Sequence, residues 1–173
     1  MIASATTGAL FLYGLQAVLT SPDGGKATVD PARYKATVVV FSSTVCPVAG
    51  DYYPRLIELW RTYGSGRGDV GFYLVFPNKT ESLDAVRAHA AEMRFPFPVY
   101  RDDANRLADA LGAQVTPTAV VTGRNGAVAF RGAIDDAANP ARVKRRYLAD
   151  AVKAVLAGRP APAVPASARE PYG

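Results

Sequence analysis

The residue of this 173-residue chain best suited to chemistry is its single cysteine, Cys46, within the segment FSSTVCPVAGDYYP (41–54). A cysteine thiolate attacks disulfides and peroxides, and the free N–H groups and dipole of a helix N-terminus stabilise it. Pro47 follows directly, and proline favours the first position of a helix. The pattern therefore predicts Cys46 as a catalytic nucleophile at a helix start, with Pro47 as a supporting residue.

The neighbours of the cysteine limit the mechanism. The hydroxyls of Ser42, Ser43 and Thr44 can donate hydrogen bonds to the sulfur or to a substrate, and we interpret Ser43 and Thr44 as supporting residues. The residue three positions after Cys46, where a C-x-x-C motif has its second cysteine, is Ala49. The alternative interpretation is a small buried thiol that fills a gap in the core.

Several other kinds of site are disfavoured by composition. One cysteine excludes an intrachain disulfide framework and a zinc site built on cysteines. His89 is the only histidine, and its place in a predicted helix favours a surface position without a catalytic role. The glycine-rich segment GSGRG (64–68) follows a predicted helix and precedes a strand, the wrong order for a phosphate loop. We expect no metal and no cofactor.

The net charge of +5 is concentrated near the C-terminus. From residue 139 onward there are seven basic residues and two acidic ones, which leaves the first 138 residues neutral overall. A basic last helix can meet an acidic partner or a lipid surface, and a solvated helix face is the default interpretation. No platform of aromatic and basic residues accompanies it, so nucleic-acid binding is not expected.

Two continuous apolar runs are the clearest structural features. ATVVVF (36–41) and VGFYLVF (70–76) are rich in β-branched and aromatic residues and predict strands buried in a parallel or mixed sheet. Between them, apolar residues at helical spacing predict a helix over 47–63 with Pro54 inside it, where proline removes a hydrogen bond.

Turn-forming residues and caps divide the rest of the chain. In chain order the remaining predicted elements are an N-terminal hairpin over 11–29, a helix capped by Thr80 and ending near Arg94, a short strand within 95–102, a short helix closed by Gly112, and a hairpin with strands 118–122 and 127–131. A last helix is predicted to begin at Pro140, behind Asn139 as its N-cap, and to end before Gly158.

The order of these elements predicts the fold class. Buried strands alternate with helices and an antiparallel pair follows, which is typical of an α/β sandwich with a mixed central β-sheet flanked by helices. We predict one domain over 1–158 and an extended C-terminal tail, rich in proline and alanine, over 159–173. The tail is expected to lie on the surface or to reach a partner.

Over residues 20–158 the sequence resembles the thioredoxin-like superfamily, and within it the redoxin branch of peroxiredoxins and bacterial thiol–disulfide oxidoreductases. Four features at the expected spacings carry the resemblance. They are Phe41 five residues before Cys46, Pro54 eight residues after it, the loop Val115-Thr116-Pro117, and the segment GRNGAVAFRGAIDD (123–136) followed by a helix.

The resemblance implies a site as well as a fold. It implies a thioredoxin-like sandwich in which Thr116 and Pro117 form a loop with a cis proline that faces Cys46 and binds the substrate backbone. Cys46, Thr116 and Pro117 are therefore the candidate catalytic residues. Because the tail of bacterial redoxins often continues past a glycine into a cysteine, a resolving cysteine beyond Gly173 is an open expectation.

The chain also departs from the pattern that it resembles. A dithiol reductase resolves the mixed disulfide with a second cysteine, which the sequence lacks, and Val40 takes the place of the buried acid of thioredoxins. Relative to peroxiredoxins, Ser43 replaces the threonine and Val39 the proline. Arg124 and Arg131 are candidates for the peroxide-binding arginine by composition only.

Two functional hypotheses follow. The first is a monothiol oxidoreductase that acts on a disulfide or peroxide through Cys46, with a protein or a small thiol or disulfide as its substrate. The second is a redox-inactive accessory subunit of a larger assembly. The N-terminal segment, uncharged over 2–22, the basic last helix and the tail are the candidate surfaces for a membrane or assembly contact. The sequence is compatible with the bacterial cell envelope or periplasm and with the cytoplasm, and it does not fix the oligomeric state.

Overall fold

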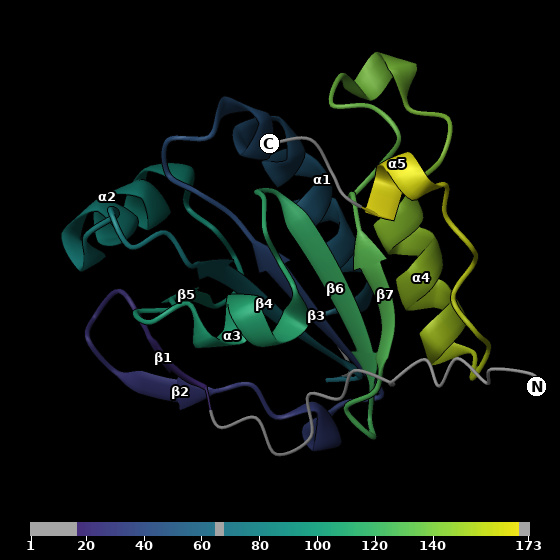
Figure 1. Cartoon of the computed structure of the whole chain (residues 1–173), viewed down its shortest axis with the longest axis horizontal. Coiled ribbons are helices and arrows are strands. Elements are labelled where there is room, and N and C mark those ends of the chain that lie inside the picture. The colour runs from purple at the N-terminus through teal and green to yellow at the C-terminus, as the bar shows by residue number, and fades with distance from the viewer. Residues whose placement is uncertain (1–16, 65–67, 170–173) are drawn as a thin grey trace, which may run out of the picture.

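A computed structural model of the chain describes residues 17–64 and 68–169. In these residues the strands form one mixed seven-stranded sheet in the order β2-β1-β5-β4-β3-β6-β7, with helices on both faces (Figure 1). The strands are β1 (Val18–Thr20), β2 (Lys26–Thr28), β3 (Ala36–Phe41), β4 (Val70–Phe76), β5 (Val99–Arg101), β6 (Thr118–Gly123) and β7 (Val128–Gly132). The α/β sandwich predicted from the sequence is confirmed.

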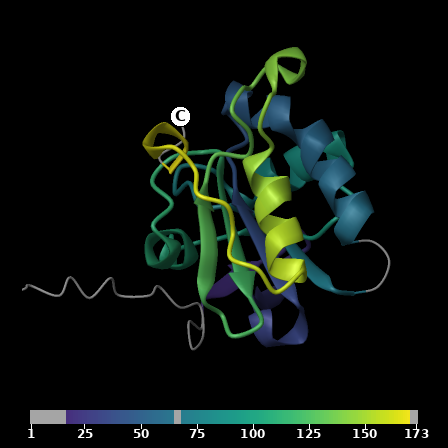
Figure 2. The same ribbon diagram turned by 90° about the vertical axis from the view of Figure 1, so that its right-hand side faces the viewer.

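The helices separate into two layers around this sheet (Figure 2). They are α1 (Pro47–Tyr63), α2 (Leu83–Met93), α3 (Arg106–Leu111), α4 (Tyr147–Leu156) and α5 (Ala166–Arg169), with the single-turn 3₁₀ helices η1 (Pro31–Arg33) and η2 (Pro140–Arg142). Pro54 lies inside α1, as predicted. None of the helices in the described residues is long and apolar enough to cross a membrane.

The central strands explain why the chain folds this way. β3 pairs in parallel with β4 and antiparallel with β6, and every residue of β3 and β4 is buried. Because side chains alternate between the faces of a strand, Val38 and Val40 pack into the core under α1 and α4, whereas Val39 and Phe41 pack with α3 on the opposite face. Fully burying each such side chain stabilises the fold by about 1.5–3 kcal/mol.

The N-terminal hairpin forms the far edge of the sheet. β1 and β2 pair antiparallel, with Val18 opposite Thr28, around the predicted turn at residues 21–25. β1 then adds to β5, which carries the hairpin into the main sheet. The first part of the predicted strand, residues 11–16, lies outside the described residues.

The predicted cap of α2 is wrong. The Ser82 hydroxyl, rather than that of Thr80, caps the helix by accepting a hydrogen bond from the Ala85 backbone N–H (3.1 Å). Thr80 instead donates its hydroxyl and its N–H to the side-chain oxygen of Asn78 (2.9 and 3.3 Å). This local turn competes with helix formation, so the helix starts later than the sequence pattern predicts.

The predicted last helix is wrong in its first turns. Asn139 is a cap as predicted, but it caps only η2, and α4 begins at Tyr147. Between the two, Asp136 holds the chain in an extended path, because its carboxylate accepts from the Lys144 N–H (2.9 Å) and its own N–H donates to the Arg145 carbonyl (3.1 Å). The cations from residues 142–146 therefore precede α4 instead of lying along it.

The segment after α4 turns back beside the sheet edge at β7 and ends in α5 (Figures 1 and 2). Ala168 of α5 is 6% exposed, and its carbonyl oxygen accepts a hydrogen bond from the Ala133 N–H just beyond β7 (2.7 Å). The C-terminal segment thus contacts the domain through Ala161, Val164 and Ala168.

Candidate functional site

Cys46 lies where the sequence places it, between a central strand and a long helix. The chain leaves β3 at Phe41, and five residues later Cys46 forms the N-cap of α1 with extended backbone angles. Pro47 occupies the first turn, and the Cys46 carbonyl accepts the first helical hydrogen bond from the Gly50 N–H (3.3 Å). Cys46 therefore lies at the N-terminus of α1, where free backbone N–H groups favour negative charge.

The predicted partner loop lies directly against the thiol. The Thr116–Pro117 peptide bond is cis, as the resemblance implied. β6 begins at Thr118, which pairs with Phe41 at the end of β3, so the loop before β6 lies beside the segment that carries Cys46. The Cys46 thiol donates to the Thr116 carbonyl oxygen at 3.4 Å. Residues 70 positions apart in the sequence thus meet in one site.

The Ser42 and Ser43 hydroxyls, which were predicted to support the sulfur, are directed elsewhere. The Ser43 Oγ is buried and donates to the Glu81 carboxylate at 2.5 Å, and the Thr44 N–H donates to the other oxygen of that carboxylate at 2.9 Å. The Ser42 Oγ is within 2.9 Å of the Tyr53 hydroxyl. The expected hydrogen bond from Ser43 to the sulfur is not formed, and its supporting role stays a prediction.

Glu81 is a site residue that the sequence pattern missed. It lies in the loop between β4 and α2, is 5% exposed, and accepts a third hydrogen bond from the Asn78 side-chain amide (3.0 Å). β3 and β4 are parallel neighbours, so the segments that follow them meet at one edge of the sheet. That rule, applied to the residues after each buried strand, was the available sequence signal.

The predicted surface position of His89 is wrong. Its ring is half-buried among Tyr53, Phe76 and Phe95, and its Nε2 lies 3.0 Å from the Tyr53 hydroxyl. Burial lowers the pKa of His89. Burial likewise raises the pKa of Tyr53 to about 12, although the hydrogen bond from Ser42 opposes the rise. A continuous chain of side chains, Ser42–Tyr53–His89, therefore runs from the cysteine loop to α2.

A groove of about 410 Å³ adjoins the cis proline. Its lining is mostly apolar and comes from α1, the cis-proline loop, the segment after β7, α4 and α5. The lining residues are Val48, Tyr52, Pro117, Ala133, Ile134, Asp135, Asp136, Ala137, Ala138, Tyr147, Ser167 and Ala168. Val48 is two residues from Cys46 and Pro117 adjoins Thr116, so the groove begins next to the thiol.

An ion pair fixes one wall of this groove. Asp135 is buried and pairs with Arg55 of α1 (2.6 Å), whose guanidinium also donates to the carbonyls of Ala137 (3.0 Å) and Ala138 (2.6 Å) and stacks over the Tyr52 ring. Burial raises the pKa of Asp135, and the charge of Arg55 opposes that rise. Asp135 is therefore a buried, paired carboxylate rather than a solvated charge.

The two arginines considered for a peroxide site are engaged elsewhere. Arg124 donates to the Ala32 carbonyl (2.9 Å) from the β6–β7 turn, and the β3–β6 register places that turn at the end of the sheet opposite Cys46. Arg131 donates to the Leu111 carbonyl at the end of α3 (3.4 Å).

Comparisons with known proteins agree with this geometry. A family model described as thioredoxin-like matches residues 34–128. An uncharacterized conserved protein from Geobacillus kaustophilus is similar in structure at 28% identity, with a TM-score of 0.74 over 85% of this chain and 83% of that one.

Two further solved structures are similar over most of the chain. A hypothetical protein from Sinorhizobium meliloti 1021 is 26% identical, with a TM-score of 0.73 over 85% of this chain and 84% of that one. A secreted Mycobacterium tuberculosis disulfide oxidoreductase, described as homologous to E. coli DsbE, has a TM-score of 0.59 at 16% identity, over 83% of this chain and 96% of that one. No curated protein sequence matches the chain.

Proposed function

The chain belongs to the thioredoxin-like family, whose model spans more than half of its length, and we propose that it is a thiol oxidoreductase that works through the single cysteine Cys46. The observation that carries the proposal is the contact of the Cys46 thiol with Thr116, at the start of α1 and beside a cis proline. Three features that converge on one atom from distant parts of the chain favour a nucleophile over a thiol that merely fills space.

The reaction has two thiol–disulfide exchanges. In the first, the Cys46 thiol loses its proton, its sulfur attacks one sulfur of a disulfide, and the second sulfur leaves as a thiolate that takes up a proton. The product is a mixed disulfide on Cys46. Since the sequence has no second cysteine, an external low-molecular-weight thiol attacks this mixed disulfide, forms a new disulfide with the substrate half and releases Cys46 as a thiol.

The apolar groove favours a substrate with peptide character. It begins at Pro117 and Val48, next to the sulfur, and its volume of about 410 Å³ accommodates apolar side chains that flank a disulfide. We infer that the backbone of a bound chain passes the Thr116 carbonyl, which accepts the thiol hydrogen in the free protein. A protein or peptide disulfide is the substrate class that we infer.

The similar M. tuberculosis protein is itself named a disulfide oxidoreductase. At 16% identity this likeness extends to the fold, so it supports the proposed reaction class by analogy only. A peroxide is the less favoured oxidant, because Arg124 lies at the opposite end of the sheet from the thiol and Arg131 donates to the Leu111 carbonyl.

A binding role without redox chemistry is the competing hypothesis. The observation that favours it is Val45, directly before the cysteine, whose side chain is 76% exposed. A large exposed apolar side chain beside a partly covered thiol suits a surface that a protein partner covers. In that case the thiol needs no reactivity above that of a free cysteine.

The test is mass spectrometry of the intact protein after brief exposure to glutathione disulfide at pH 7. The proposal predicts addition of one glutathione to the native protein faster than to the same chain unfolded in urea, release by reduced glutathione, and no addition to Cys46→Ser. Hydrogen peroxide with a sulfenic-acid trap gives the peroxide comparison. Addition no faster to native than to unfolded chain contradicts the enzyme and leaves the binding role.

A further inference from the structure

We propose that Glu81 is the positioning residue of the thiol site, because its carboxylate fixes the loop over 43–46 and so sets how Cys46 meets a disulfide. This inference rests on the proposed function and adds a residue that does not touch the sulfur. Both carboxylate oxygens accept hydrogen bonds from the loop, one from the Ser43 hydroxyl (2.5 Å) and one from the Thr44 N–H (2.9 Å).

Further hydrogen bonds connect the Glu81 carboxylate, through Ser43, to the cysteine itself. The Ser43 hydroxyl that donates to Glu81 also accepts from the Val45 N–H (3.3 Å), and the Ser43 carbonyl accepts from the Cys46 N–H (3.4 Å). The four residues before the helix, from Ser43 to Cys46, are therefore bonded to the Glu81 side chain directly or through Ser43. A change at Glu81 alters the backbone that carries the sulfur.

Burying a carboxylate here is costly, which argues for more than a packing role. Glu81 is 5% exposed, and its donors Ser43, Thr44 and Asn78 are all neutral groups. Taking a carboxylate out of water is strongly unfavourable unless hydrogen bonds compensate for it. An apolar side chain would fill the same space without that cost, but it would leave the loop donors without an acceptor.

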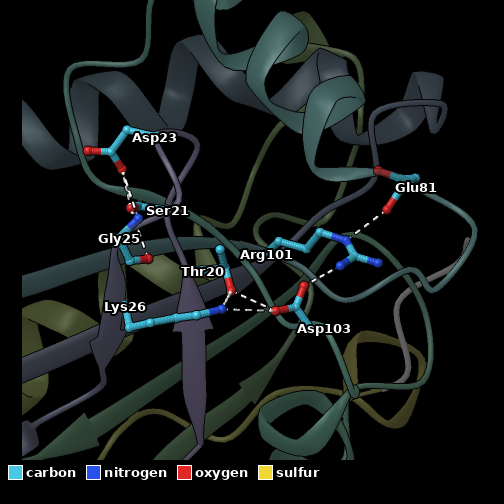
Figure 3. Close-up of polar contacts among 8 residues, drawn as sticks. All are labelled: Thr20, Ser21, Asp23, Gly25, Lys26, Glu81, Arg101 and Asp103. Carbon is cyan, nitrogen blue, oxygen red and sulfur yellow. Dashed lines mark hydrogen bonds and ion pairs between the residues drawn. The ribbon is translucent and has the colours of Figure 1, made fainter.

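Glu81 is itself held in place by ordered elements. The Arg101 side chain of β5 donates to the Glu81 carbonyl oxygen (2.8 Å) and pairs with Asp103 (Figure 3). Asp103 in turn accepts from Thr20 of β1 (2.6 Å) and lies 3.6 Å from Lys26 of β2. A chain of polar contacts thus anchors the residue to the hairpin edge of the sheet, and positioning groups are most effective when rigid elements support them.

The experiment compares two reactions of Cys46 in folded protein. Exchange with glutathione disulfide requires the sulfur to be oriented towards an S–S bond, whereas alkylation by iodoacetamide has looser demands. The ratio of the exchange rate constant to the alkylation rate constant therefore reports how the sulfur is positioned. It is insensitive to global stability. The variants are Glu81→Ala, which removes the acceptor, and Glu81→Gln, which keeps one acceptor oxygen and places a donor near the Ser43 hydroxyl.

We expect Glu81→Ala to lower the ratio by about fivefold or more, because small displacements of reacting atoms cost large factors in rate. Glu81→Gln should recover most of the loss. The control is Glu92→Gln, which makes the same charge change at an exposed position of α2 and should keep the native ratio. If Glu81→Ala does not fold, we use Ser43→Ala, which removes the hydrogen bond from the Ser43 hydroxyl to the Glu81 carboxylate. This variant is expected to lower the ratio about twofold or more.

An unchanged ratio in folded Glu81→Ala, or in Ser43→Ala where the first variant does not fold, overturns the positioning role. That result differs from failure of the proposed function, in which the native wild-type protein already shows the ratio of the chain unfolded in urea. In the latter case no orientation exists for Glu81 to provide, and the inference falls with the function.

Discussion

At the residue scale, the cysteine loop divides its two serines between opposite faces of the sheet. The Ser42 side chain joins Tyr53 on the α1 side, and the Ser43 side chain turns to Glu81 on the other. Val40 and Phe41 pack on these same two faces, so the alternation of β3 continues for two residues beyond its last paired position. The hydroxyls thereby order the loop on both sides and leave the sulfur to face Thr116.

The Tyr53 hydroxyl should contribute stability that depends on pH. Tyr53→Phe leaves the Ser42 hydroxyl and the His89 ring without this partner, which should lower the free energy of unfolding by about 1–3 kcal/mol at pH 7. Because burial raises the pKa of Tyr53 to about 12, its contribution is fully present below the unfolded value near 10 and is lost as the pH rises towards 12.

Urea unfolding of both proteins at pH 7 and pH 11 provides the measurement. The stability difference between wild type and Tyr53→Phe should shrink at pH 11, while other buried tyrosines such as Tyr73 keep titrating in both proteins. A difference of equal size at the two values would show that the Tyr53 hydroxyl is not the group that titrates.

Some residues of the candidate site were predicted from the sequence, and others were missed because their role depends on residues distant in the chain. The positions of three residues were predictable: a strand end and a helix start place Cys46, and the family resemblance places Thr116 and Pro117 opposite it. Glu81 was missed because its place beside the cysteine loop follows only from the parallel pairing of β3 and β4, and His89 was missed because its neighbours come from three different segments. Local sequence patterns hold no direct record of such tertiary neighbours.

At the element scale, Arg55 connects α1 to the segment after β7. Its side chain is 12% exposed and that of Asp135 is 5% exposed, so the pair is largely removed from water. Arg55→Met should leave a buried carboxylate and two carbonyl groups unpaired, and we expect it to cost about 3 kcal/mol of unfolding free energy at pH 7.

The pH dependence of this cost has a definite sign. Burial already raises the pKa of Asp135, and loss of the opposing Arg55 charge raises it further. A carboxyl group with a raised folded pKa destabilises the fold when it ionises, so the cost of Arg55→Met should decrease as the pH falls from 7 towards 4. Urea unfolding at both values measures it, with Arg146→Met of the exposed Arg146–Glu58 pair as control, at less than about 1 kcal/mol. A pH-independent cost would contradict the mechanism.

The elements show the same division between strong and weak sequence signals. β3 and β4 have the predicted bounds, because continuous apolar runs must be buried wherever they lie. The starts of α2 and α4 differ from prediction because side chains of Asn78 and Asp136 bind nearby backbone groups in competition with the helix. The helical and the non-helical conformations at such a position differ by about 1 kcal/mol in free energy. Capping residues alone therefore do not predict where a helix begins.

At the scale of the whole molecule, the C-terminal segment completes both the sheet edge and the groove. α5 packs against β7, and Ser167 and Ala168 line the same groove as Pro117. The groove therefore has one wall from the segment after α4 and the others from the central domain. Any movement of α5 changes the width of the surface where a substrate would lie beside Cys46.

A substitution at Gly132 tests the packing of α5 against β7 without removing the C-terminal segment. A Cβ atom at Gly132 would lie 2.3 Å from the Ala168 carbonyl oxygen, well inside the van der Waals contact distance. β7 is held by its pairing with β6, whereas α5 is a single short turn, so α5 should move. Gly132→Ala should therefore break the hydrogen bond from the Ala133 N–H and lower the free energy of unfolding by about 1–2 kcal/mol.

Hydrogen exchange at the Ala133 amide measures the displacement directly. Faster exchange at Ala133, with unchanged protection across β3 and β4, would show that α5 has left its place while the sheet remains intact. Gly50→Ala is the matched control, because a Cβ atom there meets nothing within 4 Å. If α5 forms a wall of the substrate groove, Gly132→Ala should also change the rate of exchange with a disulfide-linked peptide more than the rate of alkylation by iodoacetamide. Native protection of the Ala133 amide in Gly132→Ala would mean that the strand yields and the C-terminal segment is held more firmly than its contacts indicate.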